Sequence, residues 1–273
     1  MTMHSFDHAV ALQPTGAHQY SGATSPAYGN MVGPFGGITA ATVTQSVMQH
    51  PERLGEPIAL TVNYAAALAD GAFTVTARPV RTNRSTQHWV MEITQPDANG
   101  APATVLTATA VTAVRRETWS VDDEPMPAVP APAAVPRMTL PRSVAWVQRY
   151  AMHPITGALP TVWEGQGDSS LIQMWVRDEP QRLLDFTSLS ALADVFYPRI
   201  WLRRAKPVPT GTVSMTVYFH AGSAEHTATG SGWLLAQARG QAFRNGFFDQ
   251  TAQLWNEAGV LLATTHQIVY YKE

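Results

Sequence analysis

The side chains that this chain offers for chemistry are carboxylates, imidazoles, hydroxyls and amides, because it contains no cysteine. The lack of thiols excludes disulfides, thiolate nucleophiles, iron–sulfur clusters and cysteine-based zinc sites. The nine histidines do not recur at the spacing of a metal site. Isolated ones such as His88, His220 and His226 are interpreted as ordinary strand or surface residues. We therefore expect neither a metal nor another cofactor.

The motifs of several enzyme classes are missing from the chain. There is no G-x-S-x-G, which excludes the nucleophile elbow of the α/β-hydrolases. No H-E-x-x-H is present either, so a zinc-protease helix is not expected. The chain contains neither G-x-x-x-x-G-K-[ST] nor G-x-G-x-x-G, and the nearest run is GQGDSS at 165–170. The usual cradles for nucleotide phosphates are therefore not expected.

Composition limits the partners that the chain can have. Its 273 residues include 18 basic and 20 acidic side chains, for a net charge of −2. No basic field exists that could hold nucleic acid. No apolar run reaches the length of a membrane span, and the first ten residues do not resemble a secretory signal. We expect a cytoplasmic protein that binds neither nucleic acid nor membrane.

A proline-rich segment divides the chain into two halves. Residues 122–141 contain Pro125, Pro127, Pro130, Pro132, Pro136 and Pro141. Proline at this density is incompatible with a helix or a central strand, so the segment is interpreted as an extended, semi-rigid connector. The predicted organisation is a first unit at 1–120, a connector at 121–142 and a second unit at 143–273.

The two halves resemble each other. Each contains a helical segment, at 36–50 and 186–198, followed by strand-like runs joined by short turns. These runs lie at 57–68, 71–82, 88–100 and 104–114 in the first half, and at 211–221, 232–240, 246–259 and 261–271 in the second. The pattern predicts a duplicated α+β unit. We expect the two units to continue one large antiparallel sheet, with both helices on its concave face.

Alternation supports the strand assignments. In 212–220, Val213, Met215 and Val217 fall on one face, while Thr212, Ser214 and Thr216 fall on the other.

Several short runs together resemble one known family. FGG at 35–37 precedes the first helix, and LADVFYP at 192–198, YFH at 218–220 and ATTHQ at 263–267 follow in order. This order resembles acyl-CoA thioesterase II, the TesB-like double hot-dog thioesterases, over nearly the whole chain. The resemblance implies two fused hot-dog units, each a long helix wrapped by an antiparallel sheet. It also implies hydrolysis of acyl-CoA to a free acid and CoA.

The resemblance assigns three catalytic residues that would activate and hold a water molecule. The carboxylate falls on Asp194, the amide on Gln267 and the hydroxyl on Thr212, with Ser214 and Thr216 as alternatives. The basic residue that usually follows the FH pair is here Ala221. Without the resemblance, Asp194 would be read as a solvated helix residue, because it lies off the apolar stripe of 186–198, and Gln267 as an edge residue facing water.

CoA carries phosphates, which require positive charge nearby. Candidate substrate-binding residues are Arg199, Arg203, Arg204 and Lys206 after the second helix, Arg81 and Arg84 in the first unit, and Gly36 and Gly37 at the start of the first helix. The free N–H groups of that helix start suit an oxyanion. An apolar slot between the helices would take the acyl chain. Its candidate lining residues are Trp163, Trp175, Phe196 and Trp201, although aromatic residues usually form plain core.

Other functions stay open at this point. A hot-dog enoyl-CoA hydratase would need D-x-x-x-x-H, which is absent. A duplicated hot-dog protein that binds an acyl-thioester or another lipid without turnover would show the same fold, and a structural or interaction protein has no positive signal. Because exposed sheet edges are a hazard, we expect a homodimer or a higher even-numbered oligomer.

Overall fold

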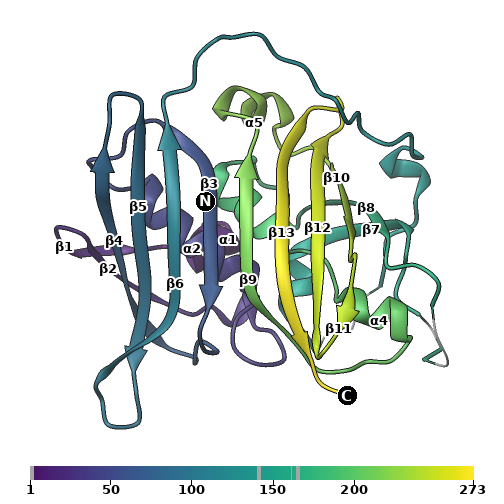
Figure 1. The fold of residues 1–273 in the computed structure, drawn as a ribbon, viewed down its shortest axis with the longest axis horizontal. Coiled ribbons are helices and arrows are strands. Elements are labelled where there is room, and N and C mark those ends of the chain that lie inside the picture. Colours follow the sequence, from purple (N-terminus) through teal and green to yellow (C-terminus); the bar gives the residue numbers. More distant parts are fainter. Residues whose placement is uncertain (1–2, 140–142, 161, 164–166) are drawn as a thin grey trace.

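In the part of the chain that the structure describes, one continuous antiparallel sheet of 13 strands has the longer helices on one side (Figure 1). The computed structural model describes residues 3–139, 143–160, 162–163 and 167–273. Residues 140–142, the end of the predicted connector, lie outside the described part. The antiparallel sheet and the shared helical face confirm the predicted α+β fold. No helix among the described residues is long and apolar enough to cross a membrane.

The strands fall into two groups along the chain. The first group comprises β1 (Gln13–Gly16), β2 (Gln19–Ala23), β3 (Glu56–Tyr64), β4 (Ala72–Thr82), β5 (Thr86–Pro96) and β6 (Pro102–Ala113). The second comprises β7 (Tyr150–Thr156), β8 (Ile172–Asp178), β9 (Thr210–Phe219), β10 (Leu234–Arg239), β11 (Phe243–Arg244), β12 (Phe247–Asn256) and β13 (Leu261–Tyr271). The helices are α1 (Ser5–Ala9), α2 (Gly36–Met48), α3 (Phe186–Leu192), α4 (Arg199–Arg204) and α5 (Ser223–Thr229). Three 3₁₀ turns lie at Pro26–Tyr28, Pro132–Ala134 and Trp146–Arg149.

Strand order is symmetric about the centre of the sheet. From the outside inward it runs β1-β2-β4-β5-β6-β3 in the first half and β7-β8-β10-β12-β13-β9 in the second. The halves join where β3 pairs with β9, from Ala59 opposite Tyr218 to Asn63 opposite Ser214. This arrangement supports duplication of one unit and confirms the predicted single sheet.

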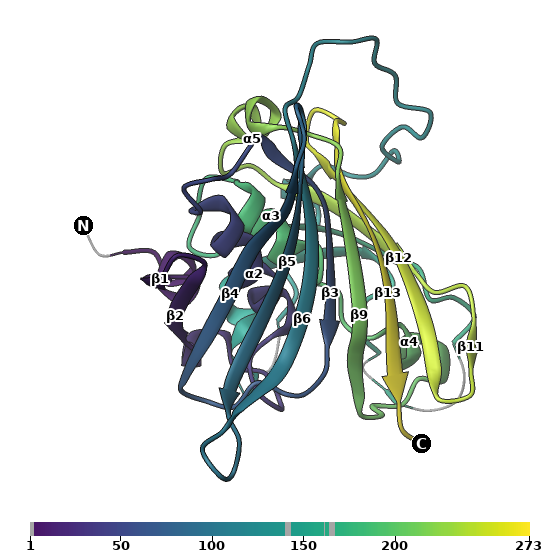
Figure 2. The same ribbon diagram turned by 60° about the vertical axis from the view of Figure 1, so that its left-hand side comes forward.

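The helices α2 and α3 pack against each other on one side of the sheet (Figure 2). Nearly every residue of α2 is buried, including its threonines. Thr42 and Thr44 donate their hydroxyl protons to carbonyls four residues earlier, which satisfies them inside the core. The hydroxyls of Thr44 and Ser190 lie 2.9 Å apart, so a hydrogen bond links the two helices.

The second helix is shorter than the sequence predicted. It begins after Asp185, whose carboxylate accepts from the backbone N–H of Ser188, and it ends at Leu192 instead of residue 198. Pro198 prevents a helix from continuing through residue 198, because proline has no N–H for the helix ladder and disfavours a helical residue before it. Nothing in the structure explains the earlier end at Leu192. The chain turns at Pro198, and α4 starts at Arg199.

The sequence pattern did not predict five short strands: β1, β2, β7 and β8, which lie at the two ends of the sheet, and β11, which pairs only with β12. The eight predicted strands are present as β3–β6, β9, β10, β12 and β13, with ends shifted by several residues in places.

The proline-rich connector packs on the outer face of the second half of the sheet. Val135 forms a small core with Trp175, Leu235 and Trp255, and Met126 and Val129 pack against it. The indole N–H of Trp175 donates to the carbonyl of Pro130 at 2.8 Å. The prediction that Trp175 lines a slot between the helices is therefore wrong. Along β8 it points to the opposite face from its neighbours Met174 and Val176.

This packing predicts that the connector stabilises the second half. Replacing Met126, Val129 and Val135 together with serine removes apolar burial and should lower the free energy of unfolding by about 2–4 kcal/mol. Chemical denaturation measures the loss, and tryptophan fluorescence should shift to the red as Trp175 becomes wetter. The control is Val121→Ser, since Val121 is 57% exposed. Equal stability of the triple variant and the control would show that the connector only joins the halves.

Candidate active site

Asp194 lies where the end of α3 meets the start of α2. It follows the last residue of α3 by two positions and is 9% exposed. The side-chain amide of Gln267 donates to its Oδ1 at 2.8 Å. Its Oδ2 lies so close to α2 that a Cβ on Gly36 would come within 2.8 Å of it. The carboxylate is thus buried and held, unlike the solvated helix residue that the helical pattern alone suggested.

Two glycines allow this close approach. A Cβ on Gly37 would lie 2.6 Å from the carbonyl oxygen of Ala191 in α3, so a larger residue would push the helices apart. The backbone N–H of Gly37 stabilises the charged form of Asp194. The phenol of Tyr64 donates to the carbonyl of Gly36 at 2.9 Å and fixes this turn to β3. The first N–H groups of α2 consequently point at the carboxylate region.

Thr212 joins the site because β9 contains a bulge. Ser214 pairs with Ile268 and Thr212 with Val269, which leaves Val213 unpaired and 37% exposed. The bulge turns Thr212 to the inner face, where its hydroxyl lies 3.5 Å from Oε1 of Gln267. The predicted placement of Val213 on the buried face and Thr212 on the other was therefore wrong.

The two alternatives to Thr212 face away from the site. The hydroxyl of Ser214 donates to Asn63 at 2.9 Å, and that of Thr216 lies 3.0 Å from the hydroxyl of Thr61. Both contacts lie on the outer face of the sheet, across the β3–β9 joint. Of the three hydroxyls, only Thr212 can act together with Asp194.

Burial raises the pKa of Asp194 from its ordinary value of 3.8 to about 7. The hydrogen bonds from Gln267 and Gly37 and the positive charge of Arg199 oppose this rise. A carboxyl group with a pKa near 7 is suited to general base catalysis, since about half of it is ionised at neutral pH and the ionised form still attracts a proton. Helix N–H groups beside it could stabilise negative charge on a carbonyl oxygen.

Arg199 is buried inside the protein and is therefore not an exposed ligand for CoA phosphates. None of its surface is exposed, and its Nη1 donates to Oε1 of Gln250 at 3.0 Å. The other predicted basic residues of this segment lie nearer the surface. Arg203 donates to the carbonyl of Gly167 at 2.7 Å, Arg204 pairs with Glu273 at 2.6 Å, and Lys206 is exposed.

Arg81 and Arg84 are not brought to the site. Arg81 is exposed near the end of β4, and Arg84 lies in the turn between β4 and β5. Four strands separate β4 from β13, which carries Gln267. At a spacing of about 4.8 Å per strand, this is a distance on the order of 20 Å. The structure does not place these arginines beside Gln267, and their contact with CoA stays a prediction.

The predicted aromatic lining is dispersed. Phe196 is buried beside Arg199, with the guanidinium carbon 5.5 Å from its ring centre. Trp201 donates to the carbonyl of Val208 at 2.7 Å, and the partly exposed Trp163 meets its ring edge-on. These residues surround α4, so they do not form a slot between α2 and α3.

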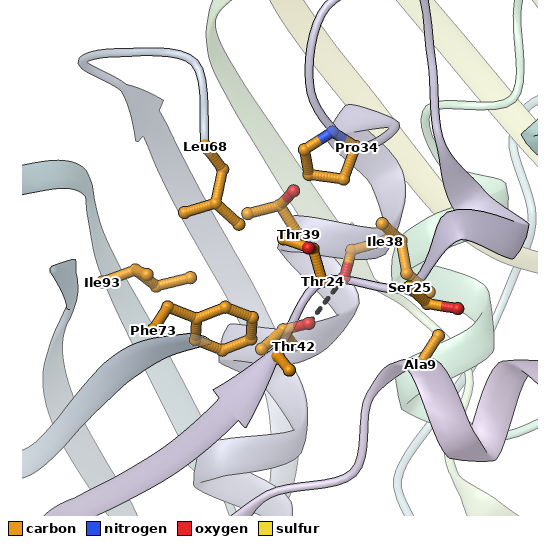
Figure 3. A pocket seen from close by; sticks show the side chains of 11 residues that line it. Ala9, Thr24, Ser25, Pro34, Ile38, Thr39, Thr42, Leu68, Phe73 and Ile93 are labelled. Atoms are coloured by element: carbon orange, nitrogen blue, oxygen red, sulfur yellow. Dashed lines mark hydrogen bonds between the residues drawn. The ribbon is translucent and has the colours of Figure 1, made fainter. Parts of the chain in front are cut away.

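A narrow pocket lies instead beside the first turns of α2 (Figure 3). Its wall from α2 consists of Ile38, Thr39 and Thr42, and Pro34 precedes the helix. The remaining lining residues are Ala9, Ala23, Thr24, Ser25, Leu68, Phe73 and Ile93. Asp194, Gly36 and Gly37 are not among its lining residues. No local sequence pattern predicts this pocket, because its walls come from α1, β2, α2, β4, β5 and the loops between them.

Two histidines that are distant in sequence meet in the fold. Nδ1 of His18 lies 3.0 Å from Nε2 of His50, and Glu52 supplies a carboxylate oxygen within 4.8 Å of a nitrogen of each. The backbone N–H of Glu52 donates to Nδ1 of His50, so Nε2 of a neutral His50 carries the proton and donates to His18. The contact is a satisfied hydrogen bond. His226 was expected on a strand or at the surface, but it is buried in α5.

Comparisons with known proteins agree with this arrangement. Residues 25–113 match the model of the acyl-CoA thioesterase N-terminal domain, and residues 122–271 match that of the C-terminal domain. The chain belongs to the acyl-CoA thioesterase family. It is a thioester hydrolase with the double hot-dog fold. The search of curated proteins found no match.

Solved structures share this fold over their full length. A hot-dog protein of unknown function from Alicyclobacillus acidocaldarius is 46% identical and has a TM-score of 0.92, with 100% of this chain and 99% of that chain covered. The tesB protein of Mycobacterium avium subsp. paratuberculosis is 14% identical, with a TM-score of 0.76 and 98% of both chains covered. An acyl-CoA thioesterase II from Mycobacterium marinum is 15% identical, with a TM-score of 0.74 and the same coverage.

The buried carboxylate predicts an unusual dependence of stability on pH. Below about pH 4 Asp194 is neutral in both the folded and the unfolded protein. Between pH 4 and 7 it ionises only in the unfolded chain, which lowers stability as the pH rises, and above 7 the loss is constant. Asp194→Asn removes this loss. It should raise the free energy of unfolding at pH 8 by about 2–4 kcal/mol and leave it nearly unchanged at pH 4.

Urea denaturation of both proteins from pH 4 to 8 measures this difference. Asp178 is buried too, and burial raises its pKa to about 7, so the wild-type curve alone contains both groups. The difference between wild type and Asp194→Asn isolates Asp194. A difference that does not change with pH would mean that the Asp194 carboxylate titrates normally.

Proposed function

We propose that this thioester hydrolase cleaves acyl-CoA by direct attack of a water molecule that Asp194 activates. The observation that carries the proposal is the buried Asp194 carboxylate, fixed by Gln267 against the first turn of α2. The chain has no cysteine and no serine elbow, so a water nucleophile is the simplest source of the new oxygen.

The hydrolysis needs one proton to leave the water and one to reach the sulfur. Asp194 accepts a proton as the water oxygen bonds to the thioester carbonyl carbon, which gives a tetrahedral oxyanion. When this intermediate collapses, the carbon–sulfur bond breaks and the CoA thiolate takes the proton from Asp194. The products are the free acid and CoA, and Asp194 is again ionised.

Two groups position the water in this proposal. Gln267 donates to Asp194 with its amide nitrogen, and its amide oxygen lies 3.5 Å from the hydroxyl of Thr212. A water between Thr212 and the carboxylate would keep one lone pair directed at the carbonyl carbon. The oxyanion would accept from the free N–H groups at Gly36 and Gly37, where the helix dipole also favours negative charge.

The rest of the substrate would extend in two directions. The acyl group would extend along α2, and the pocket beside Ile38 and Thr39, which at about 10 Å³ has room for about one water molecule, would have to widen to receive it. Arg203 lines an open polar pocket together with Arg239, and Lys206 lies exposed after α4. We propose these cations as contacts for CoA phosphates.

Substitution of Asp194 tests the proposed base. Asp194→Asn keeps the shape and removes the charge, so turnover should fall by about 10²–10⁴, or roughly 3–5 kcal/mol of barrier. The measurement is release of free thiol from a panel of acyl-CoA substrates, followed with a thiol-reactive dye to which the cysteine-free protein adds no background. Asp123→Asn is the control, since Asp123 is exposed in the connector.

Gln267→Ala should reduce turnover less than Asp194→Asn, because it removes positioning and leaves the base. The double variant should lose less than the product of the two single effects if both residues act on one water. Turnover of Asp194→Asn within about threefold of wild type, with the fold intact, would disprove the proposed role. No thiol release by wild type on any substrate would favour a protein that binds acyl-thioesters without cleaving them.

A further inference from the structure

Arg199 is a buried cation that has no acidic partner within ion-pair distance in the described part of the chain. Its side chain is completely buried, with the guanidinium carbon 5.5 Å from the ring centre of Phe196 and 5.4 Å from that of Tyr197. Its single hydrogen bond among the described residues runs from Nη1 to Oε1 of Gln250 at 3.0 Å. A neutral amide satisfies one donor but does not neutralise the charge.

The free donors of Arg199 form one edge of the guanidinium. Nε and Nη2 are both buried and have no hydrogen-bond partner in the described structure. These two nitrogens lie side by side on the face of the group that points away from Nη1. Two parallel N–H groups in this arrangement match the two oxygens of a carboxylate, which is the bidentate pairing that arginine makes best.

A buried charge without a partner destabilises the protein, and solvent does not lower this cost for Arg199. No atom of Arg199 is exposed, so a carboxylate reaches it only if the side chains packed around it move apart. Burial lowers the pKa of Arg199 to about 9, which still leaves the group charged at neutral pH. A ligand drawn into the protein that carries a negative charge would therefore gain a strong, dry ion pair.

The free edge of the Arg199 guanidinium lies near the residues of the proposed active site. Gln250, which holds Nη1, stands directly opposite Gln267 in the pairing of β12 with β13. Gln267 in turn holds Asp194. The guanidinium thus lies about one to two strand spacings, roughly 5–10 Å, from the amide that fixes the proposed base. An acyl group of a few carbons spans such a distance.

We propose that Arg199 binds a carboxylate at the far end of the acyl group, so that the preferred substrates are CoA thioesters of short dicarboxylic acids. This inference rests on the proposed function and names its substrate class. The thioester carbonyl would lie at Asp194 and the start of α2, and the second carboxylate would meet Nε and Nη2 of Arg199. Phe196 and Tyr197 would exclude water around the ion pair.

Matched substrates of equal chain length test the proposal. In at least one pair, wild type should show a higher kcat/KM for the dicarboxylate thioester than for the uncharged one. The pairs are succinyl-CoA with butyryl-CoA, malonyl-CoA with propionyl-CoA, and glutaryl-CoA with valeryl-CoA. Arg199→Met should lower kcat/KM for the preferred dicarboxylate by about 100-fold and change that for its uncharged partner by less than threefold. Arg199→Lys should retain part of the preference. The control is Arg78→Met, since Arg78 is exposed on β4.

The outcomes separate this role from two others. If Arg199 acted only on Asp194 through space, Arg199→Met would reduce both substrates of a pair equally and shift the pH profile. If it only supported the fold, the variant would unfold more easily. Under the proposal its stability is equal to or higher than that of wild type, because an unpaired buried charge has been removed. Wild type that prefers the uncharged member of every pair overturns the inference and leaves the proposed hydrolysis intact.

Binding of free acids decides the question without turnover. Butyrate, titrated by calorimetry, should bind wild type and Asp194→Asn at least about tenfold more tightly than the uncharged butyramide, and Arg199→Met should lose this difference. If wild type cleaves no acyl-CoA at all, the proposed function fails, and these titrations still test the carboxylate site. Equal binding of butyrate and butyramide by wild type would overturn it.

Discussion

The hydrogen bond between Gln267 and Asp194 holds the Asp194 carboxylate in a buried position at the start of α2, and several other features of the structure make this contact possible. A buried acid is costly unless donors satisfy it, and here a side-chain amide and a backbone N–H do so. Glycine at positions 36 and 37 lets α2 approach closely enough. The bulge at Val213 then brings a hydroxyl within reach of the amide that holds the acid.

The contact also explains why both halves of the chain are required. Gly36, Gly37 and Tyr64 come from the first half, whereas Asp194, Thr212 and Gln267 come from the second. The β3–β9 joint and the packing of α2 on α3 hold these two groups at a fixed distance. The proposed site therefore lies between the two similar units. In the second unit α3 is short, and the chain that leaves it carries Asp194 and Arg199.

The sequence predicted the fold well because strand alternation and turn residues are local signals. Gly100 and Gly259, which mark two predicted hairpins, both have positive φ angles that suit glycine. The roles of Asp194 and Gln267 came from family resemblance, and their contact depends on pairing across the fold. Burial of Arg199 had no local signal, since RIWLRR reads as a basic surface helix. The bulge in β9 and the docking of Val135 on Trp175 depend on partner strands that alternation cannot reveal.

The pH dependence of kcat/KM on the best acyl-CoA substrate tests the account most directly. An essential base must be ionised, and burial sets the pKa of Asp194 at about 7. The account predicts that log kcat/KM rises with a slope of about one up to an apparent pKa near 7 and is constant above it. The residual activity of Asp194→Asn should lack this step. A wild-type profile that is flat from pH 5 to 9, or a step that persists in Asp194→Asn, would contradict it.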